Sequence, residues 1–538
     1  MPAMLVERRA PRLVTLPEDV LLVLLTFMHV EDILALRMTA KYFTTVTKQR
    51  WVWSDAMKRH VIDKGLPVPA LKSADIKGLS SRELESRAIH AARFHDNWSS
   101  AKPIPRNTLT FDATEPSHPD PPTDDATTSE TCQDVKQVLF LPGHSGQLMV
   151  SVLESGITCW EVPLDGSKAF PVAHWTNGDS SPVSKVITND HPDSLATLAV
   201  QVRDPNNQGL FVVVVLSLDT FHGCFKELGA FKGNGAVTHP LLYMYKDWVM
   251  FGTPVWVWSW RHPAQLHTIP SHQVPNVPES DPILCVKAIG GTHLLLVRQR
   301  IIQMIRTPLF QPNGSLLWPS CCHAAKRHIR NLAAIEAAIY LPPVHSDWAV
   351  THPVHNPGHS NADALLQPMT ILMRFIDQDT MQNTIHQVDL VLYPLLLEEG
   401  KPTNGLREWK VREFPVSPSC SQLYLGSSGK GFWMETRNTT TNHTTYPARC
   451  IVGIDISRNP RLPTLDEIEA PKEQRGRELT WADASNTVKI CESMVEMRVG
   501  INEVARRRYR LTAAALDGSV GRIVVGNREG KVKVLDFA

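Results

Sequence analysis

The sequence predicts a multi-domain chain in which a small all-α module of three helices precedes an all-β propeller with seven blades. Two observations lead to this prediction. Residues 16–53 contain helix-start signals and apolar residues at helical spacing. From about residue 135 the pattern changes to pairs of short apolar runs separated by polar turns, which is typical of β-hairpins.

The first predicted helix begins at Leu16-Pro17, because proline at the first helical position has its φ angle pre-set and has no N–H group to leave unpaired. One apolar stripe follows at helical spacing and consists of Val20, Leu21, Leu24, Leu25 and Met28. A second helix is predicted from Glu31-Asp32, since acidic residues favour the positive end of the helix dipole.

The second predicted helix buries Ile33, Leu34 and Leu36. Thr39 is expected to cap a third helix, which carries Tyr42, Phe43 and Val46, and Trp51-x-Trp53 is expected to end the unit. A segment this short cannot bury so much apolar surface within itself. We therefore expect it to bind a partner.

The order of these signals over residues 13–55, about a tenth of the chain, resembles an F-box. The shared features are Leu16-Pro17, the Leu-rich helix, Asp32-Ile33, Leu36-Arg37, Phe43 and Trp53. Thr39 and Ala40 depart from the Val-Ser that the family commonly has there. The resemblance implies docking onto the Skp adaptor of an SCF ubiquitin ligase and, through it, onto a cullin. The alternative is an ordinary amphipathic helical hairpin that packs on the rest of the protein.

By this resemblance, nine residues are expected to bind the adaptor or to support the surface that does: Leu16, Pro17, Val20, Leu21, Leu24, Leu25, Ile33, Leu36 and Phe43. Several of them could instead hold the three helices together. The sequence alone leaves both roles open.

Composition narrows the classes of partner. The 538 residues include 55 Lys plus Arg and 54 Asp plus Glu, a net charge of +1, so neither nucleic acid nor an anionic membrane is indicated. Nine cysteines without a regular framework, in a chain that shows no secretory signal, favour reduced thiols. We expect a cytoplasmic and/or nuclear protein.

Three further regions are predicted after the F-box. Residues 56–98 form a helical linker, in which Ser80-x-x-Glu83 is a capping-box start. Residues 112–134 are acidic, rich in proline and nearly free of large apolar groups, which predicts disorder. Residues 135–538 form the propeller and are expected to bind the substrate.

Seven hairpins are predicted in this last region, at residues 147–162, 195–218, 247–260, 293–305, 369–395, 431–456 and 521–537. The first four begin about 40–50 residues apart, the period of a four-stranded propeller blade, and the later, longer intervals hold insertions. Another predicted strand precedes each hairpin. We expect Thr108–Phe111 to complete the last blade and close the ring.

The β region resembles a degenerate WD-repeat propeller, and Cys159-Trp160-Glu161 is one strand end of that kind. Pro142-Gly143-His144 does not stand at the usual distance from a Trp-Asp pair. The alternative fold is a pair of β-sandwiches.

The sequence predicts no metal, no cofactor and no catalytic residues. Cys321-Cys322-His323 with His328 lacks the spacing of a zinc site, and the histidines at 345, 352, 355 and 359 fall in a Pro-rich insertion. Hydrolase, metalloprotease, P-loop and kinase motifs are absent from the sequence. Gly426–Gly431 lies between predicted strands and is expected to be a turn.

One dense basic run could contact a phosphorylated or acidic substrate segment, because guanidinium groups pair bidentately with phosphate. It comprises Arg506, Arg507, Arg508 and Arg510. A nuclear import signal and a strand with charges on its solvated face are the alternatives.

Taken together, these features predict the substrate-recognition subunit of an SCF-type ubiquitin ligase. One alternative is a propeller scaffold that uses its F-box in an assembly other than a ligase. A second is a propeller hydrolase or lyase with a site in its central channel.

Overall fold

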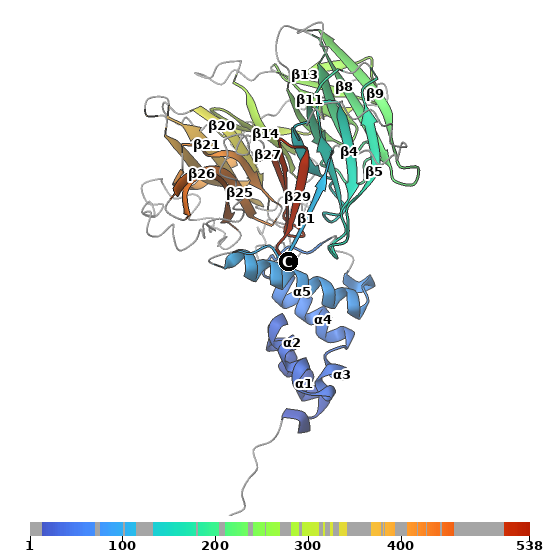
Figure 1. The fold of residues 1–538 in the computed structure, drawn as a ribbon, viewed down its shortest axis with the longest axis vertical. Helices are drawn as coiled ribbons and strands as arrows, with labels where there is room; N and C mark the ends of the chain where they lie inside the picture. The colour runs from blue at the N-terminus through green and yellow to red at the C-terminus, as the bar shows by residue number, and fades with distance from the viewer. Residues whose placement is uncertain are drawn as a thin grey trace, which may run out of the picture. The chain divides into compact units, whose positions relative to one another are not determined.

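The computed structural model contains two compact units, one that extends to Asn97 and includes Ala538, and one formed by Trp98–Phe537 (Figure 1). It describes residues 13–69, 76–100, 103–113, 133–178, 181–203, 210–234, 240–252, 254–269, 281–289, 293–310, 316–317, 323–325, 333–341, 367–377, 380, 382–392, 406–416, 418–426, 428–441, 444–456 and 511–538.

The first unit is helical. Its elements in chain order are η1 (Leu13–Thr15), α1 (Glu18–Phe27), α2 (Val30–Thr39), α3 (Lys41–Val46), α4 (Arg50–Ala56), η2 (Met57–Ile62), η3 (Ile76–Gly78) and most of α5 (Ser81–Ser99). Pro17 directly precedes α1, and Glu31 and Asp32 lie in the first turn of α2. The predicted starts of the first two helices are therefore confirmed.

Two expectations for this unit are wrong. Thr39 does not cap the third helix, because its hydroxyl donates to the carbonyl oxygen of Leu36 at 2.8 Å inside α2. Ala40, which has an extended backbone, precedes α3 instead. Trp51 and Trp53 do not end the unit either, since both belong to a fourth helix, α4.

The predicted capping box at the start of α5 is confirmed. The backbone N–H of Ser80 donates to Glu83 Oε2 at 2.8 Å, and the backbone N–H of Glu83 donates to Ser80 Oγ at 3.3 Å. The buried side of α5 in this unit includes Leu84, Ala88 and Ala91, which belong to one apolar core. Among the described residues, no helix is long and apolar enough to cross a membrane.

The second unit is largely β. The first half of its strands are β1 (Asn107–Asp112), β2 (Gln137–Phe140), β3 (Leu148–Val152), β4 (Gly156–Glu161), β5 (Phe170–Thr176), β6 (Val183–Thr188), β7 (Leu198–Arg203), β8 (Leu210–Asp219), β9 (Cys224–Asn234), β10 (Leu241–Tyr245), β11 (Trp248–Phe251), β12 (Trp256–Ser259), β13 (Leu266–Thr268) and β14 (Ile283–Ile289).

The remaining strands that the structure describes are β15 (His293–Arg298), β16 (Ile302–Arg306), β17 (Leu309–Phe310), β18 (Leu316–Leu317), β19 (His323–Ala325), β20 (Ala333–Tyr340), β21 (Gln367–Ile376), β22 (Asn383–Leu392), β23 (Leu406–Val416), β24 (Ser421–Leu425), β25 (Lys430–Thr441), β26 (Thr444–Asp455), β27 (Leu511–Asp517), β28 (Arg522–Asn527) and β29 (Lys531–Asp536).

Most strands form four-stranded antiparallel sheets of neighbouring segments. Strands β2 to β5 form one such sheet and β6 to β9 another, and a single parallel bridge between His174 and Cys224 joins the two. Strands β10 to β13, β14 to β16 with β19, and β20 to β23 form the next three, and β24 to β26 form a three-stranded sheet. Each of the seven predicted hairpins is confirmed as an antiparallel pair.

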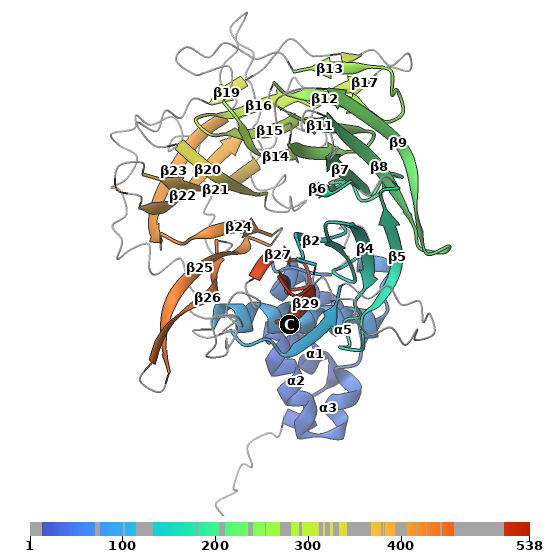
Figure 2. The same cartoon turned by 45° about the horizontal axis from the view of Figure 1, so that its top comes forward.

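The first strand of each sheet contacts the first strand of the next. Strand β2 contacts β6, and the contacts continue through β10, β14, β20, β24 and β27 back to β2. Figure 2 shows these strands around a common centre, with the other strands of each sheet further out. The sheets are therefore propeller-like, and the series differs from the face-to-face layers that a pair of β-sandwiches would form.

The last sheet takes a strand from the beginning of the unit. Strand β1 pairs with β29, so that Thr108 lies opposite Leu535 and Phe111 lies opposite Val532. The prediction that Thr108–Phe111 completes this sheet is confirmed. Asp112 is the last residue of β1, and residues 114–132, most of the segment predicted to be disordered, lie outside the described residues.

Arg522 on β28 joins the last sheet to the first. Its side chain is 1% exposed and forms two hydrogen bonds with the Asp536 carboxylate, at 2.5 and 2.9 Å. The same guanidinium donates to the carbonyl oxygens of Gly146, Val162 and Pro163 at 2.9, 2.6 and 3.0 Å. These three residues flank β3 and β4, so one buried cation links two sheets.

Candidate functional site

Helix α1 exposes four large apolar side chains on one face. Phe27 is 73% exposed and Val23 is 57% exposed, and Val20 and Leu24 on the same helix are also exposed. These four residues, at positions i, i+3, i+4 and i+7, are called the α1 face below. Contiguous exposed apolar surface on a soluble protein typically marks a site of protein interaction.

The opposite side of α1 is already buried. Leu21 and Leu25 are 1% and 3% exposed. Leu25 belongs to a core that also contains Val30, Ile33, Val46, Val52, Trp53, Ala56, Met57, Val61, Leu84, Ala88 and Ala91. The helical unit thus has its own core, so the α1 face is not needed to complete it.

The nine residues predicted from the F-box resemblance divide into three groups. Pro17, Val20 and Leu24 are exposed and therefore available to a partner. Leu21, Leu25, Ile33 and Phe43 are buried, and their observed place is inside the helical unit. Leu16 and Leu36 are half-buried.

The sequence-based residue set omitted several exposed apolar residues. Val23 and Phe27 on α1, Leu13 and Val14 on η1 and Met38 near the end of α2 are all exposed. The signal that could have identified the first two is the absence of a polar face on α1, whose apolar residues occur all around the helix. A helix that is apolar all around is typically buried on more than one side.

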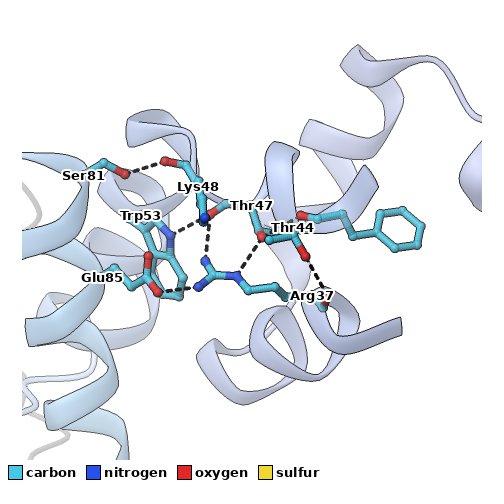
Figure 3. Close-up of polar contacts among 8 residues, drawn as sticks. Arg37, Thr44, Thr47, Lys48, Trp53, Ser81 and Glu85 are labelled. Carbon is cyan, nitrogen blue, oxygen red and sulfur yellow. Dashed lines mark hydrogen bonds and ion pairs between the residues drawn. The ribbon is translucent and has the colours of Figure 1, made fainter. Parts of the chain in front are cut away.

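A polar network holds together the other helices of the unit that contains the α1 face (Figure 3). Arg37 on α2 donates from Nε to Thr47 Oγ1 at 3.0 Å and pairs with Glu85 Oε1 on α5 at 2.5 Å. Its guanidinium lies 5.5 Å from the centre of the Trp53 ring, and Trp53 Nε1 donates to the Thr47 carbonyl oxygen at 2.7 Å. The network therefore fixes α2, the end of α3, α4 and α5 together.

The side chains of Ser81 and Arg50 extend the network to the loops. Ser81 Oγ donates to the Lys48 carbonyl oxygen at 2.6 Å (Figure 3). Arg50 donates to the carbonyl oxygens of Ile76, Lys77 and Leu79 at 3.1, 2.8 and 3.0 Å. These bonds satisfy backbone acceptors that the short helices leave unpaired. The α1 face is thus carried by a pre-organised unit.

Two histidines and a lysine lie close together in the same unit. The rings of His29 and His60 are 4.9 Å apart, and Lys64 Nζ lies 3.2 Å from His29 Nδ1. Burial lowers the pKa of His60, and the charges of Lys64 and His29 lower it further, whereas Asp55 raises it. His60 is therefore held in its neutral form.

We expect the helical unit to be less stable in mild acid. The pKa of His60 in the folded protein is below its unfolded value of about 6.5, so the unfolded chain binds the proton more readily. The stability from neutral His60 is retained above pH 6.5 and is lost as the pH falls from 6.5 towards the folded pKa.

Melting followed by helical circular dichroism at pH 7.5 and 5.5 should show this loss of stability, and His60→Gln should make the loss smaller. The control variant His222→Gln, on an exposed turn of the β unit, should leave the difference unchanged. An equal loss in His60→Gln would show that another group titrates.

The structure does not test the other residues that the sequence analysis weighed for chemistry. The basic run Arg506, Arg507, Arg508 and Arg510 lies outside the described residues, as do Cys321, Cys322, His328 and the four histidines of the insertion. Within the part of the chain that the structure describes, no group of three or more His, Cys, Asp or Glu side chains could hold a metal ion.

No family model matches the sequence. No curated protein matches it either. Among solved structures, the crystal structure of the WD40 domain of SCAP from fission yeast is similar at 11% identity and a TM-score of 0.37, over 75% of this chain and 82% of that chain. The strand pairings and the contacts between successive sheets of this chain are themselves propeller-like. The fold and site define a two-part protein, a small helical unit with an exposed apolar face and a largely β unit.

Proposed function

We propose that this chain is the substrate-recognition subunit of an SCF-type ubiquitin ligase, which binds a Skp adaptor through residues 13–55 and a target protein through the β unit. The observation that carries the proposal is the α1 face, which leaves Phe27 and Val23 largely in water although the unit has a complete core elsewhere. The F-box resemblance assigns this same helix to the adaptor. Burial of such residues at an interface is the main source of its binding energy.

For the β unit we propose a seven-bladed propeller. The series of first strands that begins and ends at β2 supports it, and so does the strand β1 that completes the last sheet. A propeller presents loops from every blade around its ring, which suits it to bind another protein.

Under this proposal the chain performs no covalent chemistry itself. It brings a lysine of the bound target close to a charged ubiquitin-conjugating enzyme, and this proximity raises the effective concentration of the reacting groups. A location in the cytoplasm and/or the nucleus is part of the proposal.

Co-purification of the full-length chain with recombinant Skp adaptor and cullin tests the proposal. The variant Val23→Ser with Phe27→Asp should bind the adaptor about 1,000-fold more weakly or worse, since interface anchors contribute about 2 kcal/mol or more each and about 1.4 kcal/mol corresponds to a factor of ten. Both residues are exposed, so circular dichroism should show an unchanged fold. The control Leu195→Asp changes a residue that is 59% exposed on the turn between β6 and β7, and it should bind normally.

Each outcome separates the alternatives. Adaptor binding that is lost in the double variant and accompanied by cullin supports the ligase receptor. Adaptor binding without cullin supports the scaffold that uses its F-box in another assembly. If the double variant still binds the adaptor, the α1 face is not the adaptor-binding surface. If the unmodified chain does not bind the adaptor, the F-box assignment is wrong.

A further inference from the structure

A second surface lies on the β unit, around an open cavity of about 590 Å³. The turn between β2 and β3, strands β3 to β5 and the turn after β8 form its walls, and Ser145, Glu161, Phe170, Val172 and Thr220 are among the lining residues. We call it the rim cavity, because β5 and β9 are the last strands of their two sheets (Figure 2).

Glu161 gives the rim cavity a negative charge without a counter-charge. It is half-buried at the end of β4, and none of the residues that the structure describes forms a hydrogen bond or ion pair with its carboxylate. The neighbouring carboxylates differ, since Asp165 accepts from the backbone N–H of Ser167 at 2.9 Å and Asp219 pairs with Lys226 at 2.6 Å. A half-buried carboxylate without a partner is stabilised by an incoming lysine or arginine.

Two exposed aromatic side chains belong to the segments that form the walls of the rim cavity. Phe170 on β5 lines the rim cavity and is exposed, and Phe221 follows the lining residue Thr220 and is 91% exposed. Aromatic residues, phenylalanine included, are enriched at the centres of protein interfaces. The rim cavity thus combines one anionic group with an apolar edge.

The turn that presents Phe221 is ordered by its own hydrogen bonds. Asp219 Oδ1 accepts from the backbone N–H groups of Phe221 and His222 at 3.1 and 3.0 Å, while Asp219 Oδ2 accepts from Lys226. The bonds from Lys226 and His222 lower the pKa of Asp219. The backbone of the turn that carries Phe221 is therefore held in one conformation, and a pre-organised backbone loses little conformational entropy on binding.

The opposite wall contains backbone strain. Ser145 has a φ of 51°, in the left-handed region, and lines the rim cavity between Gly143 and Gly146, which also have positive φ angles. A residue with a side chain is uncommon in this region, and strain of this kind concentrates at binding sites.

We infer that the rim cavity is the docking site for a short extended segment of the target protein, in which a lysine or arginine pairs with Glu161 and an apolar side chain packs against Phe170 and Phe221. This inference rests on the proposed function, because the target is the protein that the β unit holds. An extended segment fits this arrangement, because residues two apart in an extended chain point to the same face and can reach Glu161 and the aromatic edge together.

A positional-scanning array of synthetic hexapeptides, probed with the purified full-length chain, tests the inference. We expect selection of Arg or Lys at one position and of an apolar residue two positions away, the same-face spacing of an extended chain. Glu161→Gln should weaken the best peptide about tenfold, as expected for a lost charge-assisted hydrogen bond. Glu161→Arg should redirect selection to Asp and Glu, and Phe221→Ser should weaken binding without a change of charge preference.

Glu154→Gln is the matched control, because Glu154 is an exposed carboxylate on the turn between β3 and β4 that pairs with Lys136 at 3.3 Å. It should leave selection unchanged. The same charge preference in the unmodified chain and in Glu161→Arg would overturn the inference, and so would an array without selection. Adaptor co-purification of the same variants separates the two proposals. If the chain selects charged peptides but does not bind the adaptor, the rim-cavity inference stands and the ligase proposal fails. If the chain binds the adaptor but selects no charge, the ligase proposal stands and the rim-cavity inference fails.

Discussion

Replacement of Arg522 by methionine is expected to lower the free energy of unfolding of the β unit by about 3–5 kcal/mol. The change leaves the Asp536 carboxylate, which is 18% exposed, without its bidentate partner. It also removes the donor from the carbonyl oxygens of Gly146, Val162 and Pro163. Buried acceptors that lose their partner keep the full cost of desolvation. Guanidinium unfolding followed by tryptophan fluorescence would measure the effect.

Three further variants identify the cause. Arg528→Met is the matched control, since Arg528 is 42% exposed and lies 4.0 Å from Asp134, and it should cost less than about 1 kcal/mol. Arg522→Lys should recover only part of the loss, because an ammonium group lacks the planar fork that serves several acceptors. Arg522→Met with Asp536→Leu should also recover part, since no buried charge is then unpaired. If Arg522→Met were as mild as the control, the link between the first and last sheets would not depend on this side chain.

Replacement of Trp53 by alanine is expected to destabilise the helical unit by about 3–5 kcal/mol, the usual cost of removing a buried tryptophan. Trp53 is fully buried in the core of this unit and donates to the Thr47 carbonyl oxygen at 2.7 Å. Its ring also supports the Arg37 guanidinium. Hydrogen exchange measured by mass spectrometry should show faster exchange in α2 to α4, while strands of the β unit keep their protection.

Trp51 is the matched control, two residues away on the same helix and 48% exposed. Trp51→Ala should cost under about 1 kcal/mol, as expected for a surface substitution. Trp53→Phe should cost about 1 kcal/mol for the lost hydrogen bond, because Arg37 still donates to the same Thr47 carbonyl oxygen. Equal effects of Trp51→Ala and Trp53→Ala would contradict the role assigned to Trp53 in the core.

Local signals predicted the elements well where neighbouring residues determine them. The Ser80–Glu83 capping box depends on residues three apart, and the turn at Asn527–Gly530 depends on a glycine that adopts a positive φ of 76°. Thr108–Phe111 is expected from the sequence to complete the last blade, and β1 does pair with β29. Hairpins and caps of this kind are stabilised by contacts close in sequence.

The helical unit shows where local signals were insufficient. Thr39 has the side chain of a helix cap, yet its hydroxyl bonds back to Leu36 in the preceding turn. The helix α4 was missed because part of its stabilisation comes from Arg50, which bonds to carbonyl oxygens more than 25 residues away. Contacts at that distance along the chain leave no trace in local spacing.

For the candidate sites, the sequence by itself determined the apolar character of α1 and the positions of the hairpins. Only the tertiary structure decided that Leu21 and Leu25 are buried while Val23 and Phe27 remain in water. It also distinguished Arg522, a charge enclosed by acceptors from two sheets, from Glu161, a half-buried charge that pairs with none of the described residues. The physical reason is the same in each case. Burial and charge pairing depend on which distant segments pack against a side chain, and residue type and local spacing do not specify those neighbours.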